Sequence, residues 1–246
     1  MTDSAPNMIQ ELPWKPAIQA IKDSVNFDDF ATFRAHLEES LPYNSAATRE
    51  RYAQTIIKYF FPNGTLGGLP ERAWRAYRDA QVLEDLIRYQ FLSQESTVAQ
   101  FVVAHLGPMA PGSVLKHKSF KDFIEEVDPK GRSKMVERLG QALRRMGFVV
   151  RERQQDVAVQ LRPSKTSLLL LIHHLFAPTP RIVTLRDILA DPFWQYLGFR
   201  QEETIRRALH EANARGLIAG YATIDQLEQI TTRYTLDEWL EARLQL

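Results

Sequence analysis

The sequence predicts a mainly α-helical fold with short β-hairpin wings, in which an N-terminal helical domain precedes two tandem repeats of one design. Two observations predict it. Apolar residues recur at helical spacing in the first third, and the later order of elements occurs twice at an offset of 65 to 69 residues. The 246 residues leave room for one large domain or two to three small ones. With 44% hydrophobic and 25% charged residues, the composition is typical of folded soluble proteins and excludes collagen-like and wholly disordered chains.

The first 96 residues predict an extended arm followed by helices. Residues 1–16 contain three prolines and little periodicity, so we expect an N-terminal arm there. The helical domain spans residues 17–96, with one helix from a capping Asn-Ser pair to about Phe60 and another over residues 71–93. The glycine-containing loop between these helices lacks the Lys-Ser/Thr pair of a phosphate-binding P-loop, so we interpret it as a turn.

The remaining sequence predicts a first repeat, residues 97–165, and a second repeat, residues 166–246. Each repeat has a short apolar helix, a helix with a Ser or Thr cap, a second helix, a glycine and a few apolar residues. In the first repeat these segments are 97–106, 119–124, 133–146, Gly147 and 148–150, and in the second they are 167–176, 184–189, 202–215, Gly216 and 217–219. This is the order of elements in a winged helix-turn-helix.

A β-hairpin completes the first repeat. Residues 148–151 and 157–161 show strand-like alternation on either side of a polar tip. In the second repeat, residues 222–234 could form either a wing or a helix, and the sequence leaves both open. Thr235 is then the predicted cap of a short last helix.

Positive charge is concentrated in the middle of the chain. Residues 112–165 hold 13 Lys and Arg against 7 Asp and Glu, a net charge of +6, whereas the flanking segments carry −3 and −2. This asymmetry is typical of a localised surface that binds a polyanion. A well-solvated basic face is the structural alternative.

The second helix of the first repeat has a basic side opposite an apolar one. Val136, Leu139, Leu143 and Met146 share the side that we expect to be buried. The candidate DNA-binding residues face outward on this helix or lie in the wing: Lys134, Arg138, Gln141, Arg144, Arg145, Arg151 and Arg153. Arg can bind guanine edges, Gln can pair with adenine, Lys can neutralise phosphate, and wing arginines can reach the backbone or the minor groove.

The matching helix of the second repeat has no such side. Its outward positions are Glu203, Arg207, His210 and Ala214, so one cation faces one anion. We expect this helix to read DNA poorly and to pack against a partner or another copy of the chain.

Several function classes are excluded or disfavoured by residues that the chain lacks. Without cysteine it has no disulfide, thiolate nucleophile or Cys-rich zinc site, and its six histidines nowhere show HxxxH spacing. We therefore expect no catalytic residues, no metal and no cofactor. The longest apolar run, residues 168–176, is too short to span a bilayer and no signal peptide is apparent, so we expect a cytoplasmic protein without membrane contact.

The sequence of residues 41–130 resembles the BrxA family of the BREX phage-exclusion systems. The resemblance is carried by Asn44-Ser45-Ala46-Ala47-Thr48-Arg49-Glu50-Arg51, by the helix of Trp74, and by the helix of Gln90 that leads into Phe120 to Ile124. It implies a small, all-helical to winged-helix DNA-binding protein without catalysis of its own, encoded beside a methyltransferase and ATPases that protect bacteria from phage. It supplies no site residues. The pattern Ser45-x-x-Thr48-x-x-x-Tyr52 also resembles the arm domain of tyrosine recombinases, but their Arg-His-Arg-Tyr catalytic set is missing.

These observations together predict a non-catalytic protein that binds double-stranded DNA, as a component of a BREX-type phage-defence system in which other defence proteins are candidate partners. Two alternatives stay open. A winged-helix transcriptional regulator would prefer one DNA sequence over bulk DNA. A protein–protein adaptor subunit would show no salt-sensitive DNA binding.

Overall fold

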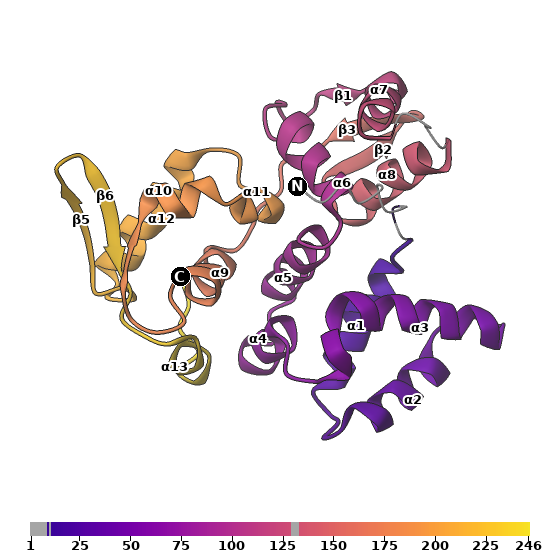
Figure 1. Ribbon diagram of the computed structural model, residues 1–246, viewed down its shortest axis with the longest axis horizontal. Coiled ribbons are helices and arrows are strands. Elements are labelled where there is room, and N and C mark those ends of the chain that lie inside the picture. Colours follow the sequence, from indigo (N-terminus) through magenta and orange to yellow (C-terminus); the bar gives the residue numbers. More distant parts are fainter. Residues whose placement is uncertain (1–8, 10, 129–132) are drawn as a thin grey trace. The chain divides into compact units, whose positions relative to one another are not determined.

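The computed structural model of the protein describes residue 9, residues 11–128 and residues 133–246. The protein is mainly helical, as predicted, and has two small three-stranded antiparallel sheets (Figure 1). Two compact units form the chain: unit 1 is Met1–Glu71 with Gln90–Leu161, and unit 2 is Arg72–Tyr89 with Arg162–Leu246. Residues 1–8 and residue 10 of the predicted arm lie outside the described residues.

The N-terminal helices of unit 1 enclose an aromatic core. They are α1 (Trp14–Ser24), α2 (Phe30–Ser40) and α3 (Ala46–Phe60), followed by a 3-10 turn (Pro62–Gly64). The rings of Phe33 and Phe61 lie 4.6 Å apart between centroids, and those of Tyr59 and Phe91 lie 5.0 Å apart. The Tyr59 hydroxyl also hydrogen-bonds to the buried carboxylate of Glu95. These contacts explain why the end of α5 (Ala80–Leu92) belongs to unit 1.

The first repeat forms the rest of unit 1. Its elements are α6 (Ser96–Phe101), a turn of π-helix (Val102–Leu106), β1 (Val114–Leu115), α7 (His117–Val127), α8 (Ser133–Arg145), β2 (Val149–Glu152) and β3 (Gln155–Ala158). The strands pair in the order β1-β3-β2. Gly147, at a φ of 80°, follows α8 in the left-handed region, and the hairpin turns at Arg153 and Gln154, both at positive φ. The predicted hairpin is confirmed.

The second repeat forms most of unit 2. Its elements are α9 (Lys165–Phe176), β4 (Ile182–Thr184), α10 (Leu185–Ala190), α11 (Phe193–Leu197), α12 (Glu202–Ala214), β5 (Gly220–Ile224), β6 (Leu227–Thr231) and α13 (Leu236–Glu241). Residues 220–231 form a hairpin, which decides between the two alternatives left open by the sequence. The sheet order is β4-β6-β5, the same arrangement as in the first repeat.

The single helix predicted over residues 71–93 is wrong. Two helices, α4 (Leu69–Tyr77) and α5, replace it and meet at Arg78 and Asp79. Arg78 has a φ of 53°, which a right-handed helix cannot include. The Asp79 carboxylate accepts hydrogen bonds from the backbone N–H groups of Gln81 (2.7 Å) and Val82 (3.2 Å), so it caps the start of α5.

A buried ion pair ties the first part of α5 to unit 2. The Asp85 carboxylate accepts a hydrogen bond from the backbone N–H of Ser164 (2.7 Å) and another from Arg88 (2.9 Å). The Arg88 guanidinium also donates to the Leu197 carbonyl (3.5 Å). Because of these contacts, the predicted helical domain, residues 17–96, is divided between the two units.

The predicted helix caps of the two repeats have different outcomes. The Thr184 hydroxyl accepts a hydrogen bond from the backbone N–H of Asp187 (3.1 Å), which confirms the cap of α10. In the first repeat the predicted start at Ser119 is wrong, because α7 begins two residues earlier, at His117. The cap of α13 at Thr235 is confirmed as a complete capping box.

Candidate nucleic-acid interface

The apolar side of α8 is buried as predicted. Val136, Leu139, Leu143 and Met146 are each at most 8% exposed. Lys134, at the start of the helix, is exposed and has no side-chain partner in the described part of the chain. The amphipathic pattern therefore orients α8 correctly, and its polar side can be considered residue by residue.

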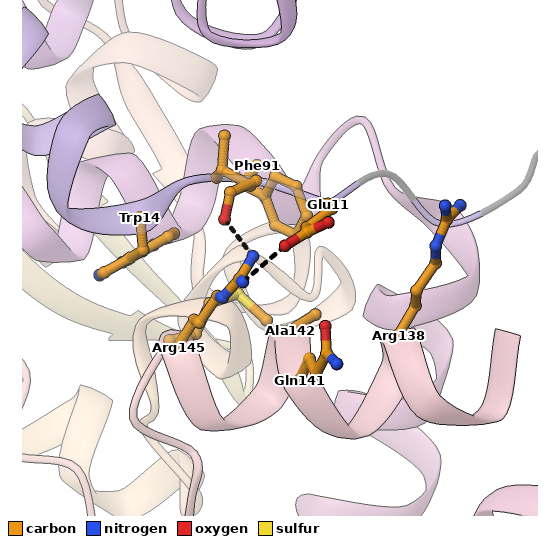
Figure 2. A pocket seen from close by; sticks show the side chains of 9 residues that line it. Glu11, Trp14, Phe91, Arg138, Gln141, Ala142 and Arg145 are labelled. Carbon is orange, nitrogen blue, oxygen red and sulfur yellow. Dashed lines mark hydrogen bonds and ion pairs between the residues drawn. The ribbon is translucent and has the colours of Figure 1, made fainter. Parts of the chain in front are cut away.

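The polar side of α8 is partly covered by the N-terminal strap, which we define as residue 9 and residues 11–14. The Arg138 guanidinium donates to the Ile9 carbonyl (2.9 Å). Arg145 donates to the Leu12 carbonyl (2.7 Å) and to the Glu11 carboxylate (2.9 Å), as Figure 2 shows. The expectation that this side is open to solvent is therefore wrong for Arg138 and Arg145, which are only partly exposed.

The strap is anchored by its apolar side chains. Ile9 is 0% exposed and Leu12 is 4% exposed, and full burial of an aliphatic side chain stabilises a fold by about 1.5–3 kcal/mol. The cavity left between the strap and α8 is about 10 Å³, roughly the space of one water molecule. The hydrogen bond from Arg145 lowers the pKa of Glu11, so that carboxylate is held in its charged form. The strap is thus a structural part of unit 1.

Gln141, the third predicted contact on this side, is bound within its own helix. Its side-chain amide donates to the Glu137 carboxylate (2.9 Å), one turn earlier. Contacts of Arg138, Gln141 and Arg145 with DNA stay a prediction. In the structure the two arginines bind the strap, and Gln141 binds within α8.

Arg144 and Arg151 meet at a single buried carboxylate. Arg144 Nη1 lies 2.8 Å and 2.9 Å from the two carboxylate oxygens of Asp156, and Arg151 Nη1 lies 3.2 Å from one of them. Asp156 is 5% exposed, whereas the Arg144 and Arg151 side chains are 30% and 54% exposed. Sheet alternation places Arg151 and Asp156 on the face of the hairpin toward α8. Two predicted site residues are therefore brought together by an acidic residue outside the predicted set.

A hollow of about 360 Å³ opens beside this cluster, and we call it the α7–α8 hollow. Its lining comes from α7, α8 and the hairpin: His117, Phe120, Val136, Glu137, Gly140, Arg144, Arg151 and Asp156. A Cβ atom on Gly140 would lie 3.3 Å from Arg144 Nη1. The glycine therefore lets the Arg144 guanidinium lie back along its helix toward Asp156.

Further basic side chains lie at the start of α7 and at the hairpin tip. Lys116, His117, Lys118 and Arg153 are exposed, and their side chains have no partner among the described residues. The site prediction omitted the first three, although a Lys-His-Lys run before a predicted helix in the basic segment was a usable signal. Together with three predicted residues and Lys134 they form what we call the basic surface: Lys116, His117, Lys118, Lys134, Arg144, Arg151 and Arg153.

The matching part of unit 2 neutralises its arginine internally. Arg206 of α12 donates to the Glu228 carboxylate of β6 (3.0 Å), which also accepts a hydrogen bond from the Tyr221 hydroxyl (2.6 Å). The His210 ring lies against the Tyr221 ring at a tilt of 31°, with 4.0 Å between centroids. Arg207 is exposed and has no partner in the described ranges. One free arginine on a mixed helix face agrees with the charge pattern expected from the sequence.

The described residues contain no group of three or more His, Asp or Glu side chains arranged to hold a metal ion. Within the same ranges, no helix has the length and apolar character needed to cross a membrane. Comparisons with protein-family models, with curated proteins and with solved structures find no significant match to this chain.

Proposed function

We propose that the protein is a non-catalytic double-stranded DNA-binding protein and that the basic surface of unit 1 makes the contact. The observation that carries the proposal is the set of exposed basic side chains in this repeat that have no partner among the described residues: Lys116, Lys118, Lys134 and Arg153. The basic surface contains six Lys and Arg residues, and the segment to which it belongs, residues 112–165, has a net charge of +6. Asp156 is buried, so exposed charge in this region is predominantly positive. Such a surface attracts the phosphate backbone of nucleic acid.

The arrangement of the first repeat supports the same proposal. The order helix, strand, two helices and hairpin, with the sheet order β1-β3-β2, supports the winged helix-turn-helix that we propose for this repeat. In such domains the second helix of the pair and the hairpin lie against DNA. Here Lys134 begins that helix and Arg153 lies at the hairpin tip, so both occupy positions that suit DNA contact.

The strap affects which kind of DNA contact we propose. Arg138 and Arg145, which could otherwise reach guanine, already donate to strap oxygens. The cations that remain free suit contacts with phosphates, which position a protein on DNA without reading its sequence. We therefore propose binding with little sequence preference, which separates this protein from a regulator of one operator.

An electrophoretic shift of a random 25-base-pair duplex at two salt concentrations tests this proposal. If about four to six phosphates are neutralised, log K falls with log salt at a slope of about −4 to −5. Competition by unrelated duplexes should be nearly equal. A shift that does not respond to salt, or no shift at low salt, would remove the proposal.

We further propose that the protein acts in a BREX-type phage-defence system, which rests on the resemblance of residues 41–130. Deleting its gene in a host that carries the system should raise phage plating efficiency, and the intact gene should restore protection. A variant without the basic surface cations should fail to restore it. Unchanged plating after deletion would contradict this part of the proposal.

One observation favours a second candidate function, an adaptor role for unit 2. Ile182, Ile224 and Leu227 are 56%, 55% and 43% exposed and share one face of the β4-β6-β5 sheet. Exposed apolar side chains gathered on one face are typical of surfaces that contact another protein. Co-purification of a defence protein that is lost on Ile224→Ser and Leu227→Ser, with DNA binding unchanged, would support this role.

A further inference from the structure

The α7–α8 hollow combines two arginines, a buried carboxylate and a glycine in a way that the fold itself does not require. Arg144 and Arg151 each use only Nη1 in their bonds to Asp156. Their other guanidinium nitrogens have no partner among the residues that the structure describes. His117 adds a ring to the same lining. The hollow is therefore bordered by N–H donors that lack acceptors.

Unit 2 has an apolar residue at the position of Asp156, and its own ion pair between helix and hairpin, Arg206–Glu228, lies at other positions. Asp156 pairs with Arg151 on one side and, on the other, with the residue that precedes the N-cap of α7. In unit 2 the equivalent residue is Ile230, which pairs with Tyr221 and with the residue that precedes the N-cap of α10. Where unit 1 has a carboxylate and an arginine, unit 2 has a fully buried isoleucine and a tyrosine.

The alignment of α8 with α12 supports the same correspondence between the two units. Both α8 and α12 have 13 residues, and a glycine at positive φ follows each of them. Counting from the helix starts, Gly140 corresponds to Leu209 and Arg144 corresponds to Asn213. Leu209 is 0% exposed, so a large apolar side chain occupies the place that Gly140 leaves open in unit 1.

This difference indicates a function for the cluster in unit 1. Asp156 is buried, and apolar residues of similar volume in place of a buried charged group often give equal or higher stability. The second repeat has such a residue, Ile230, at this position. A glycine inside a helix and a charged cluster beneath the hairpin are both unfavourable for stability alone, so a ligand that needs guanidinium donors explains them better.

We propose that the α7–α8 hollow is a phosphate-binding site that, in the proposed function, receives a backbone phosphate of duplex DNA. Arg guanidinium groups match the oxygens of a phosphate in two-point hydrogen bonding. Asp156 holds both arginines in place and leaves their outer nitrogens to the ligand. The site would fix the position of the hairpin and α8 on the DNA backbone without reading a base. This inference rests on the proposed function, and the experiment below separates the two.

The first variant is Gly140→Leu, which puts the side chain of the second repeat into the hollow without changing any charge. The new Cβ and its branches displace the Arg144 guanidinium and fill the cavity. We expect duplex affinity to fall about tenfold and the salt slope to become shallower by about one unit. The matched control is Gly220→Leu in β5, where a Cβ meets no atom within 4 Å. Circular dichroism and a thermal melt check that both variants fold.

The second variant is Arg151→Gln, which keeps the Arg144–Asp156 pair and removes the more exposed arginine. We expect affinity to fall about five- to tenfold for every duplex sequence. Arg207→Gln, with the same charge change in the second repeat, is the matched control and should stay within about twofold of the wild type. This pair keeps the proposal falsifiable if Gly140→Leu does not fold.

The outcomes distinguish the site from the function. If the wild type binds duplex in a salt-sensitive way and both Gly140→Leu and Arg151→Gln bind equally well, the phosphate site is overturned and the proposed function stands. If the wild type binds no duplex, the proposed function fails, and inorganic phosphate is titrated while the arginine Nε–H signals are followed by NMR. Saturable shifts that disappear in Gly140→Leu would assign the hollow to a free phosphate group, and their absence would overturn the site.

Discussion

The two repeats share a backbone plan and differ in what they place on it. Both have a 13-residue helix followed by a glycine at positive φ, and both sheets place the third strand between the other two. In the first repeat the helix and the hairpin meet at the cluster of Arg144, Arg151 and Asp156, beside unpaired lysines. In the second repeat Leu209 and Ile230 fill the equivalent positions with apolar side chains, and the pair of Arg206 and Glu228 neutralises charge within the unit.

This comparison separates the requirements of the fold from those of the proposed function. Ile230 and Leu209 show that the helix–hairpin junction can be closed by ordinary apolar packing. A carboxylate at the position of Asp156 is therefore not required by this fold. The exposed cations without partners can consequently be removed without redesigning the core, whereas Arg144 and Arg151 compensate the buried charge of Asp156.

The largest effect should come from shortening the apolar side chain that fills the helix–hairpin junction of the second repeat. Leu209→Ala removes a fully buried side chain and should lower the free energy of unfolding of unit 2 by about 3 kcal/mol. Gly140→Ala should stay within about 1 kcal/mol of the wild type, because better helix propensity offsets the displacement of Arg144. Urea denaturation followed by tryptophan fluorescence and circular dichroism measures both. Equal losses would contradict the difference in packing that we assign to Leu209 and Gly140.

A smaller effect should follow from releasing the strap. Arg138→Ala with Arg145→Ala removes the hydrogen bonds to Ile9, Leu12 and Glu11, and should lower the stability of unit 1 by about 2 kcal/mol after allowance for partial exposure. Hydrogen exchange at residues 11–14 should accelerate. If the exchange rates stay unchanged while DNA binding is lost, these arginines contact DNA directly and the strap does not occupy them.

The smallest effect concerns pH. The hydrogen bond from Arg145 lowers the pKa of Glu11, so this contact stabilises the folded protein above the ordinary glutamate pKa of about 4.3 and is lost as the pH falls through the lowered value. Because Glu11 is 40% exposed, we expect about 0.5 kcal/mol. Glu11→Gln should be less stable than the wild type at pH 7 and equal to it near pH 2. A difference that grows as the pH falls would contradict this assignment.

Much of the fold was predictable because its signals are local. The buried stripe of α8, the glycines that follow α8 and α12, and the capping box at Thr235 each depend on a few neighbouring residues. The sequence did not predict the break between α4 and α5, because the pattern of apolar residues contains no sign that Arg78 has a positive φ. The division of α5 between two units was missed because its cause is the distant contact of Asp85 with Ser164.

The site was only partly predictable for a similar reason. A helical plot identifies the side of α8 that faces away from its own core, but it contains no information about a segment more than 120 residues away. Ile9 and Leu12 lie on that side and bind Arg138 and Arg145. The role of Asp156 depends on strand register, which pairs it with Arg151. The net charge of residues 112–165 predicts a basic surface without these details, because it is a sum over the whole segment.

Fluorescence anisotropy of a random duplex over a range of salt concentrations tests the central claim most directly, with one double variant from each repeat. Arg151→Ala with Arg153→Ala removes two arginines of the basic surface, and Arg186→Ala with Arg207→Ala removes two exposed, unpaired arginines of the second repeat. We predict that log K of the wild type falls with log salt at a slope of about −4 to −5. This slope should be shallower by about two units for the first variant and unchanged for the second. Equal loss from both variants, or a wild-type slope near zero, would contradict this claim.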